Sequence, residues 1–281
     1  MKILITGSSG FLGRRASAYL SSLGHQILAP SHTQFDITDR SGMDICFRQH
    51  HPQIVLHCAA ISDTGLCQRE PERSHEINVT GSANLARACA KYDSKLIFCS
   101  SDQVYAGSPL PGPHLESEPL TPATVYAQHK LQAEQLCREL CPDTVSLRLS
   151  WMYACQFLPE EHGHLLTVLH DVLHHDSTSI FRSVYDFRGI TDVDSVIRHL
   201  PAAISLPAGV YNFGAENDLD SYNTLRTVFE TLGLQDALQR LVLDPQAFHR
   251  DIRMDSSLAA SYGISFESTQ AGLIRALSQC I

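Results

Sequence analysis

Strand-length apolar runs alternate with helix-length segments over the first 150 residues, and this alternation limits the possible folds more than any other feature of the chain. The runs that predict strands are Lys2–Thr6, His25–Pro30, Ile54–Ala60, Lys95–Ser101 and Val145–Ser150. Mostly apolar runs are typical of parallel strands that are buried on both faces. Because parallel neighbours need a crossover, the segments between them should form helices on both faces of the sheet. The sequence therefore predicts an α/β fold with a doubly wound parallel sheet.

A glycine-rich turn separates the first predicted strand from the first predicted helix. Gly7, Gly10 and Gly13 have the spacing Gly-x-x-Gly-x-x-Gly, one residue wider than the common dinucleotide fingerprint. Missing side chains at the first two glycines let the backbone approach a phosphate, and the third lets the helix pack close to the sheet. Amides at a helix N-terminus also attract anions. The turn predicts a Rossmann-type dinucleotide site, the alternative being an ordinary tight turn.

The alternation becomes less regular after Trp151, which predicts a second part of the chain. We expect residues 1–155 to form the dinucleotide-binding Rossmann domain. Residues 156–281 should form a smaller, partly discontinuous substrate-binding lobe over the carboxyl ends of the strands, with a return to the first domain near residues 188–206. Elements expected in this part are helices at 165–175, 194–200, 222–232 and 268–279, and strands at 179–184 and 209–213.

Tyr126 and Lys130 are four residues apart in a predicted helix, Tyr126–Leu140, so their side chains share one helical face. A free tyrosine has a pKa of about 10, too high for efficient proton exchange at neutral pH. A neighbouring ammonium stabilises the phenolate and lowers this pKa. The pair predicts a general acid, although Tyr-x-x-x-Lys alone is more often a tyrosine at the edge of a core beside a solvated lysine.

Together, the glycine spacing and the Tyr-x-x-x-Lys pair resemble the extended branch of the short-chain dehydrogenase/reductase superfamily. Further stretches match motifs of that branch: Leu56–Ala60, Ile77–Gly81, Cys99–Tyr105 and Leu147–Tyr153. The Ser-Asp-x-Val-Tyr and Arg-x-Ser-Trp-x-Tyr motifs are most similar to the dTDP-4-dehydrorhamnose reductase family. They also resemble the regulatory β-subunit of methionine adenosyltransferase. Gln103 departs from the reductases, which commonly have an aromatic residue there.

The resemblance implies reduction of a keto group on a nucleotide-linked deoxysugar, with Tyr126, Lys130 and Ser101 as catalytic residues. Tyr126 would donate the proton, Lys130 would tune it and bind a ribose, and Ser101 would hydrogen-bond the substrate oxygen. Asp102 and Trp151 would face the substrate. The residues expected to contact the cofactor, besides Tyr126 and Lys130, are Gly7, Gly10, Phe11, Leu12, Gly13, Asp36, Ile37, Cys58, Ala59, Ala60 and Cys99.

The end of the second predicted strand bears on the choice of cofactor. Ala29-Pro30-Ser31-His32 offers no acidic residue to bind the ribose hydroxyls of NAD. Ser31 and His32, with Arg14 or Arg15 nearby, could instead receive a 2′-phosphate. The sequence favours NADP, with NAD as the alternative.

Composition excludes several partners. The net charge of −9 and the lack of a basic run argue against nucleic acid or an anionic membrane. No segment approaches the length of a membrane span, and the apolar run after Met1 is too short for a signal peptide. The nine cysteines have no Cys-x-x-Cys spacing and predict reduced thiols. We expect a cytoplasmic protein with a small nucleotide-sugar substrate, and the resemblance is compatible with a homodimer.

His170-Asp171-Val172-Leu173-His174 is close to the zinc motif His-Glu-x-x-His. An aspartate replaces the glutamate and no third ligand is evident, so no metal site is predicted.

Two other functions remain open on these motifs. An NAD-dependent epimerase or dehydratase of nucleotide sugars would use the same three side chains and regenerate its cofactor. A non-catalytic nucleotide-binding regulatory subunit could also retain the Tyr-x-x-x-Lys pair.

Overall fold

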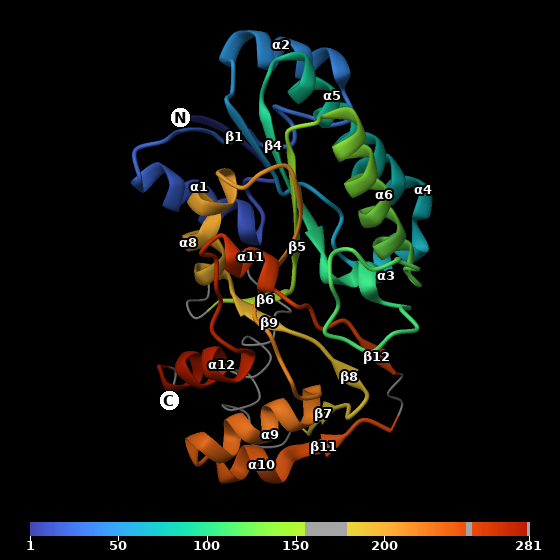
Figure 1. Cartoon of the computed structure of the whole chain (residues 1–281), viewed down its shortest axis with the longest axis vertical. Coiled ribbons are helices and arrows are strands. Elements are labelled where there is room, and N and C mark those ends of the chain that lie inside the picture. Colours follow the sequence, from blue (N-terminus) through green and yellow to red (C-terminus); the bar gives the residue numbers. More distant parts are fainter. Residues whose placement is uncertain (155–178, 246–248, 280–281) are drawn as a thin grey trace.

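A computed structural model of the chain describes residues 1–154, 179–245 and 249–279 (Figure 1). The helix expected at residues 165–175, with its His170–His174 motif, lies outside the described residues.

The predicted parallel sheet is confirmed. It contains six strands in the order β10-β5-β4-β3-β1-β2, and every neighbouring pair is parallel. The strands are β1 (Lys2–Thr6), β2 (Gln26–Leu28), β3 (Ile54–His57), β4 (Lys95–Ser101), β5 (Thr144–Leu149) and β10 (Gly209–Phe213). Because β1 lies between β2 and β3, the strand order reverses there. In open α/β sheets, ligands bind outside the carboxyl ends of the strands at such a point.

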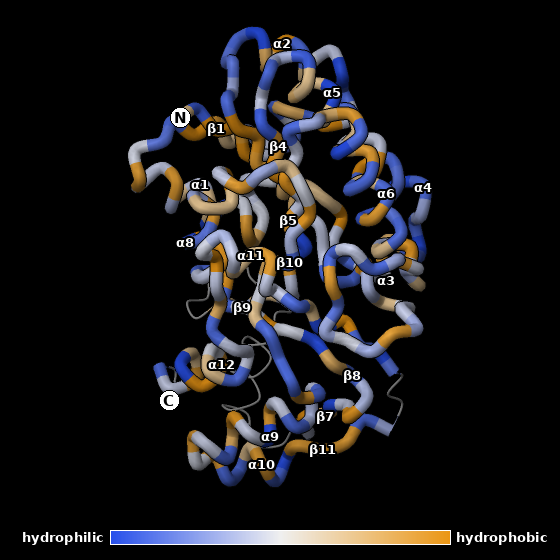
Figure 2. Tube along the Cα trace, viewed as in Figure 1, coloured by the Kyte–Doolittle hydropathy of each residue, from blue (hydrophilic) through white to orange (hydrophobic). Residues whose placement is uncertain are grey.

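Helices cover both faces of this sheet. On one face, α1 (Phe11–Ser22) packs beside α8 (Val193–Ile204) over a core that includes Ile3 and Ile5. On the other, α2 (Arg40–His50), α5 (Ser82–Lys91) and α6 (Val125–Leu140) enclose a core that includes Leu4. Alternate residues of β1 thus serve opposite cores, which is why its three middle residues are all apolar (Figure 2).

The amphipathic pattern of residues 76–92 predicts one long helix, but the structure divides this segment in two. A π-helical stretch, Glu76–Gly81, leads into α5. Two short helices, α3 (Thr64–Arg69) and α4 (Pro71–His75), come before it. Ile37 packs where a side chain on Gly81 would stand, since a Cβ there would lie 2.7 Å from Ile37 Cδ1. Helices of five and six residues are too short to show a helical period in sequence.

A smaller assembly lies beyond the carboxyl ends of the strands, in the lower part of Figure 1. Three parallel pairs of short strands run through it: β6 (Trp151–Tyr153) with β9 (Ile190–Asp192), β7 (Ile180–Arg182) with β11 (Leu241–Leu243), and β8 (Asp186–Phe187) with β12 (Arg250–Asp251). Helices α9 (Ser221–Leu232), α10 (Gln235–Arg240) and α12 (Thr269–Ser278) share a second core around Phe229 and Leu273. Helix α11 (Ser257–Ser261) packs instead against β10.

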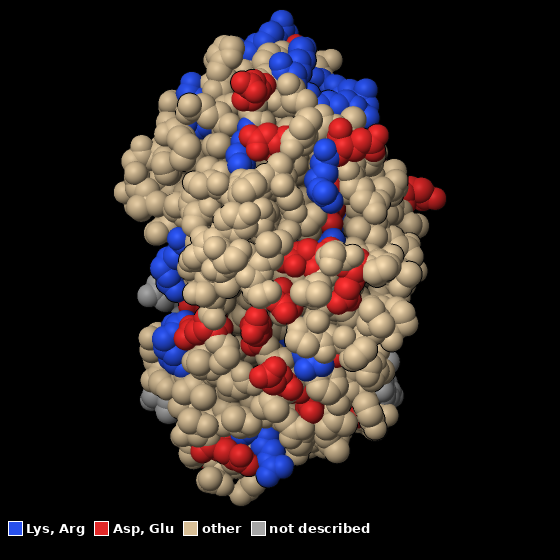
Figure 3. All heavy atoms as spheres, in the orientation of Figure 1, with Lys and Arg blue, Asp and Glu red and all other residues tan. Residues whose placement is uncertain are grey.

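Charged side chains are mixed over the face of the molecule in Figure 3. Acidic groups gather across its middle and lower parts, and basic groups at the end near α2. Among the described helices, none joins enough length to enough apolar character to cross a bilayer.

Candidate active site

A cavity of about 1040 Å³ opens at the carboxyl ends of β1, β3, β4 and β5. The part of the molecule that contains the sheet contributes the glycine turn, the start of α1 and one face of α6. The smaller assembly contributes Trp151, Arg188 and Arg250. Most residues that the sequence assigns to the site line this cavity, namely Gly7, Gly10, Phe11, Leu12, Gly13, Cys58, Ala60, Cys99, Ser101, Asp102, Tyr126, Lys130 and Trp151.

The glycine turn is shaped by close backbone contacts. Gly7 has a φ of +66°, and a Cβ there would lie 2.7 Å from the amide nitrogen of Ala59. A Cβ on Gly13 would lie 2.2 Å from the carbonyl oxygen of Gly7. A side chain is therefore excluded at Gly7 by the segment that follows β3, and at Gly13 by the turn itself.

The N-terminus of α1 meets the cavity without a side-chain cap, because its N-cap is Gly10. Several other helices have a side-chain cap, for example Asp39 on α2 and Thr124 on α6. An uncapped N-terminus that opens into a cavity suits a phosphate group. The residues present therefore fit a dinucleotide.

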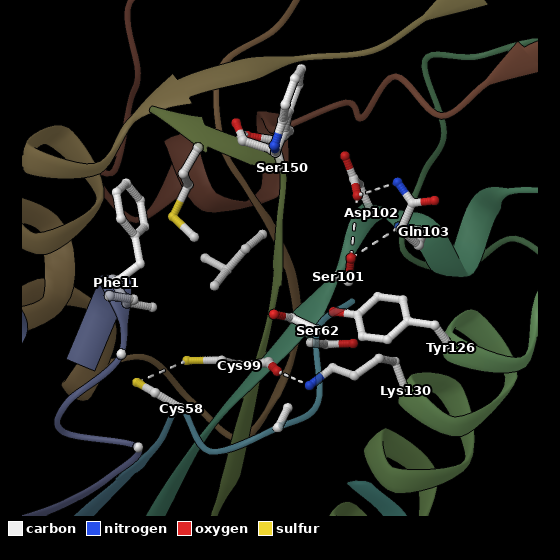
Figure 4. Close-up of a pocket in the computed structure, with 18 of the residues that line it drawn as sticks. Phe11, Cys58, Ser62, Cys99, Ser101, Asp102, Gln103, Tyr126, Lys130 and Ser150 are labelled. Carbon is white, nitrogen blue, oxygen red and sulfur yellow. Dashed lines mark hydrogen bonds between the residues drawn. The ribbon is translucent and has the colours of Figure 1, made fainter. Parts of the chain in front are cut away.

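Tyr126 and Lys130 lie one turn apart on the face of α6 that meets the cavity, and both side chains are buried (Figure 4). The Lys130 ammonium donates a hydrogen bond to the carbonyl oxygen of Cys99 and stands 4.5 Å from the centre of the Phe98 ring. Its orientation is thus fixed from β4 rather than by the phenol.

Burial, rather than the ammonium, controls the phenol in this structure. The low dielectric around Tyr126 raises its pKa above the ordinary value, and interaction with the Ser101 hydroxyl only partly offsets this. The net shift of the Tyr126 pKa is therefore upward, opposite to the lowering that the sequence predicts. Burial also lowers the pKa of Lys130 itself.

Ser101 ends β4, where its hydroxyl donates to Asp102 Oδ1 at 3.2 Å and accepts from the amide of Gln103 at the same distance. The other oxygen of Asp102, Oδ2, is buried with no hydrogen-bond partner in the described structure. Burial raises the pKa of Asp102 to about 6, against the opposing effect of Arg188. A buried carboxylate oxygen without a partner at a cavity wall is suited to accept a hydrogen bond from a ligand.

Two arginines that the sequence did not assign to the site line the far end of the cavity. Arg250 Nε lies 2.8 Å and Arg188 Nε 3.4 Å from Asp186 Oδ1. Arg188 also stands over the Trp151 ring, 5.1 Å from its centre. Arg182 interacts electrostatically with the same carboxylate. Three guanidinium groups around Asp186 favour an anion at this end.

Five residues expected to hold the cofactor do not line the cavity: Ser31, His32, Asp36, Ile37 and Ala59. Ser31 and His32 are exposed in the loop after β2, which a hydrogen bond from Ser8 to Pro30 holds beside the glycine turn. Ile37 is buried in the core, and Asp36 accepts from both the amide and the hydroxyl of Thr38. Their role in binding stays a prediction.

Other lining residues were not assigned to the site: Ser9, Ser62, Thr64, Ser100, Gln103, Thr124, Leu149, Ser150 and Met152. Most of them lie within or next to the matched stretches, where the motif gave them no role of their own, whereas Ser62 and Thr64 belong to no motif. Arg188 and Arg250 could not be found from sequence, because they are distant in the chain and meet only through the pairing of β8 with β12. Among the described residues, no cluster of three histidine, cysteine or acidic side chains could hold a metal ion.

Comparison with known proteins adds to this geometry. A family profile described as the RmlD substrate binding domain matches residues 1–249. The dTDP-4-dehydrorhamnose reductase of Mycolicibacterium smegmatis is 34% identical over 152 residues, which cover 54% of this chain and 46% of that protein. The enzyme of that name from Aggregatibacter actinomycetemcomitans is 25% identical over 86% of this chain and 83% of its own length.

Solved structures show the same fold. The dTDP-4-dehydrorhamnose reductase of Bacillus anthracis, solved in complex with NADP, superposes with a TM-score of 0.86 at 20% identity, covering 99% of this chain and 98% of that one. This likeness confirms the Rossmann-type architecture. In sequence, the chain spans about half the length of the first curated relatives that it matches.

Proposed function

Because the chain belongs to the family of the RmlD substrate binding domain, we propose that it is an NADPH-dependent reductase of a keto group on a nucleotide-linked deoxysugar. The observation that carries the proposal is that Ser101, Tyr126 and Lys130 come together in one cavity with the glycine turn. The chain's relatives named dTDP-4-dehydrorhamnose reductase support this choice of reaction.

The nicotinamide, when bound, supplies a hydride to the carbonyl carbon. Negative charge then develops on the carbonyl oxygen, where the Ser101 and Tyr126 hydroxyls stabilise it as hydrogen-bond donors. Because burial raises the pKa of Tyr126, the phenol is protonated at neutral pH. Tyr126 can therefore deliver the proton that completes the alcohol, and Lys130 beside it favours the phenolate that remains.

The two ends of the cavity suit the two ligands. The uncapped start of α1 and the close approach of Gly7 and Gly10 to the cavity fit the pyrophosphate of the dinucleotide. Arg188 and Arg250, at the other end, fit the diphosphate of a nucleotide sugar. Asp102 Oδ2 and Trp151, which line the same cavity, would contact the sugar. NADP is favoured over NAD because no acidic side chain directly follows β2. The expected compartment is the cytoplasm.

The test mixes purified protein, NADPH and a dTDP-4-keto-6-deoxy sugar and follows the nicotinamide absorbance. Steady loss of absorbance with one alcohol formed per NADPH supports the proposal. An isomerised or dehydrated sugar without net loss of NADPH would identify an epimerase or dehydratase. Absence of turnover with dTDP- and UDP-linked ketosugars alike would leave the regulatory subunit as the better description.

A further inference from the structure

Cys58 and Cys99 form a contacting pair of thiols in the wall of the cavity. The reduction proposed above assigns no chemical role to either thiol. Their sulfur atoms are 3.6 Å apart and face each other in Figure 4. Both residues line the cavity, Cys58 being half-buried and Cys99 7% exposed. A small solute in the cavity can therefore reach them.

The backbone places this pair correctly for a covalent bond. Strands β3 and β4 are parallel with His57 opposite Phe98, so Cys58 and Cys99 come next and lie side by side. Neighbouring strands are about 4.8 Å apart, and a disulfide joins Cα atoms that are about 4.4–6.8 Å apart. Small rotations of the two side chains can therefore close the gap without separating the strands.

The other cysteines that the structure describes lack this arrangement. No second pair of sulfur atoms is in contact among the seven described cysteines. Cys89, Cys137 and Cys141 are buried in the core between the sheet and α5 and α6, away from the cavity. Cys46 is half-buried on α2 and serves as a natural control.

The surroundings give the two thiols different reactivities. A hydrogen bond from Cys58 and the nearby Lys130 charge lower the pKa of Cys99, against the opposing effect of burial. The same hydrogen bond, together with burial, raises the pKa of Cys58. Cys99 is thus the better nucleophile, and Cys58 is the partner that keeps its proton.

We propose that Cys58 and Cys99 are a modification site, where a small hydroperoxide oxidises the two thiols to a reversible disulfide that weakens dinucleotide binding. The Cys99 thiolate attacks the terminal oxygen of the hydroperoxide, giving a sulfenic acid and releasing an alkoxide that takes up a proton. The Cys58 sulfur then attacks the Cys99 sulfur, and water leaves with the hydroxyl group and the Cys58 proton. Two thiols lose two electrons, and the hydroperoxide becomes one alcohol and one water.

The effect on binding rests on the proposed function. The Cys58 carbonyl carbon would lie 2.8 Å from a Cβ on Gly7, so this peptide supports the glycine turn directly. The carbonyl of Cys99 holds the Lys130 ammonium. A disulfide rotates both cysteine side chains within the cavity wall, beside these two supports, and so changes the surface that the dinucleotide would meet.

The first test maps the disulfide in the full chain, without any cofactor. Reduced protein is treated with hydrogen peroxide, alkylated and digested with trypsin, which yields one peptide of residues 49–69 with Cys58 and one of residues 96–130 with Cys99. We expect a linked pair that separates on reduction. Because residues 49–69 also contain Cys67, the map is repeated in Cys67→Ser, where the link must persist. Recovery of both peptides unlinked, under conditions that oxidise Cys46, overturns the proposal.

The second test measures NADPH affinity by fluorescence for reduced, oxidised and re-reduced protein. We expect Kd to rise at least tenfold on oxidation and to recover on reduction, in wild type and in Cys46→Ser alike. An unchanged Kd in protein shown to carry the disulfide overturns the effect on binding. If reduced protein fails to bind NADPH, the proposed function fails instead, and the peptide map still decides whether the disulfide forms.

Discussion

Two ionisable side chains near Lys130, His57 and Tyr126, are uncharged because burial disfavours the charged form of each. His57, beneath the cavity, hydrogen-bonds Thr6 and Ser82, and burial lowers its pKa to about 3, so the ring is neutral. Tyr126 is held neutral by its raised pKa. Burial lowers the pKa of Lys130 itself, and its ammonium is held by the carbonyl oxygen of Cys99.

Replacing Tyr126 by phenylalanine removes the proton donor and leaves the ring. We expect kcat to fall by about 10²–10⁴-fold with NADPH affinity within a factor of three, because general acids contribute that much. Steady-state rates and a fluorescence titration measure the two quantities. Tyr92→Phe, whose hydroxyl bonds Asp44 on α2, is the matched control and should keep full activity. Equal rates for the two variants would remove Tyr126 from the chemistry.

Asp102 should make stability depend on pH. Its pKa rises from 3.8 unfolded to about 6 folded, so the protonated form is favoured in the native state. The stabilisation is fully present below pH 4 and is lost as the pH rises through 6, by about 3 kcal/mol in all.

Asp102→Asn lacks this titration and isolates its contribution. Relative to the variant, wild type should therefore gain up to about 3 kcal/mol in unfolding free energy as the pH falls from 7 to 4. Urea unfolding of both proteins across that range measures the difference. A difference that stays constant with pH would show that Asp102 does not titrate there.

At the level of elements, the glycine turn joins β1 to α1 and fixes where the helix begins. The residues after the turn predict a helix from Arg14, but the structure includes Gly13 in α1, which starts at Phe11. Gly7 takes the left-handed conformation and lies against Ala59, which follows β3. One turn thus aligns two strands and one helix around the cavity.

Gly7→Ala tests this alignment against Gly24→Ala. Both glycines have positive φ, 66° and 83°, so both substitutions carry a similar backbone strain of about 1–2 kcal/mol. A Cβ at Gly24 meets nothing within 4 Å, whereas one at Gly7 collides with the Ala59 backbone. We expect Gly7→Ala to lose more stability than Gly24→Ala and to weaken NADPH binding at least tenfold. Thermal unfolding and titration of both variants provide the comparison, and matching results would contradict the close approach.

Elements with a strong local pattern could be predicted from sequence. Strands β1, β4 and β10 have the expected bounds, because mostly apolar runs are typical of buried parallel strands. The pairs β8–β12 and β6–β9 could not be predicted, since two- and three-residue strands have no period and pair with distant segments. For the same reason Arg250 was missed, because only its pairing beside Asp186 brings it into the cavity.

A cavity lies between the sheet and the smaller assembly, and we propose that each of its ends holds a phosphate-containing group. The sheet end is built by short motifs in the glycine turn, β4 and α6, each of which was predictable by itself. The far end needs Arg188 and Arg250, which are distant in sequence and meet only in the folded chain. Division of the chain into residues 1–155 and 156–281 remains a prediction.

Arg250→Gln should weaken binding at the arginine end of the cavity and leave binding at the glycine turn unchanged. We expect KM for the nucleotide sugar to rise at least tenfold while KM for NADPH stays within a factor of two, because the guanidinium lies far from the glycine turn. The control is Arg226→Gln on α9, an exposed arginine paired with Glu230, which should change neither constant. A rise in KM for NADPH alone would place the diphosphate elsewhere.

The position of β10 has a consequence for biosynthesis. This strand lies beside β5 in the sheet but follows it by about sixty residues along the chain, and α8, which covers α1, comes just before it. While the ribosome is adding those residues, the nascent chain holds β5 with an open edge and α1 with an uncovered apolar side. Chaperone binding is therefore expected at this stage of translation and should end when residue 213 has emerged.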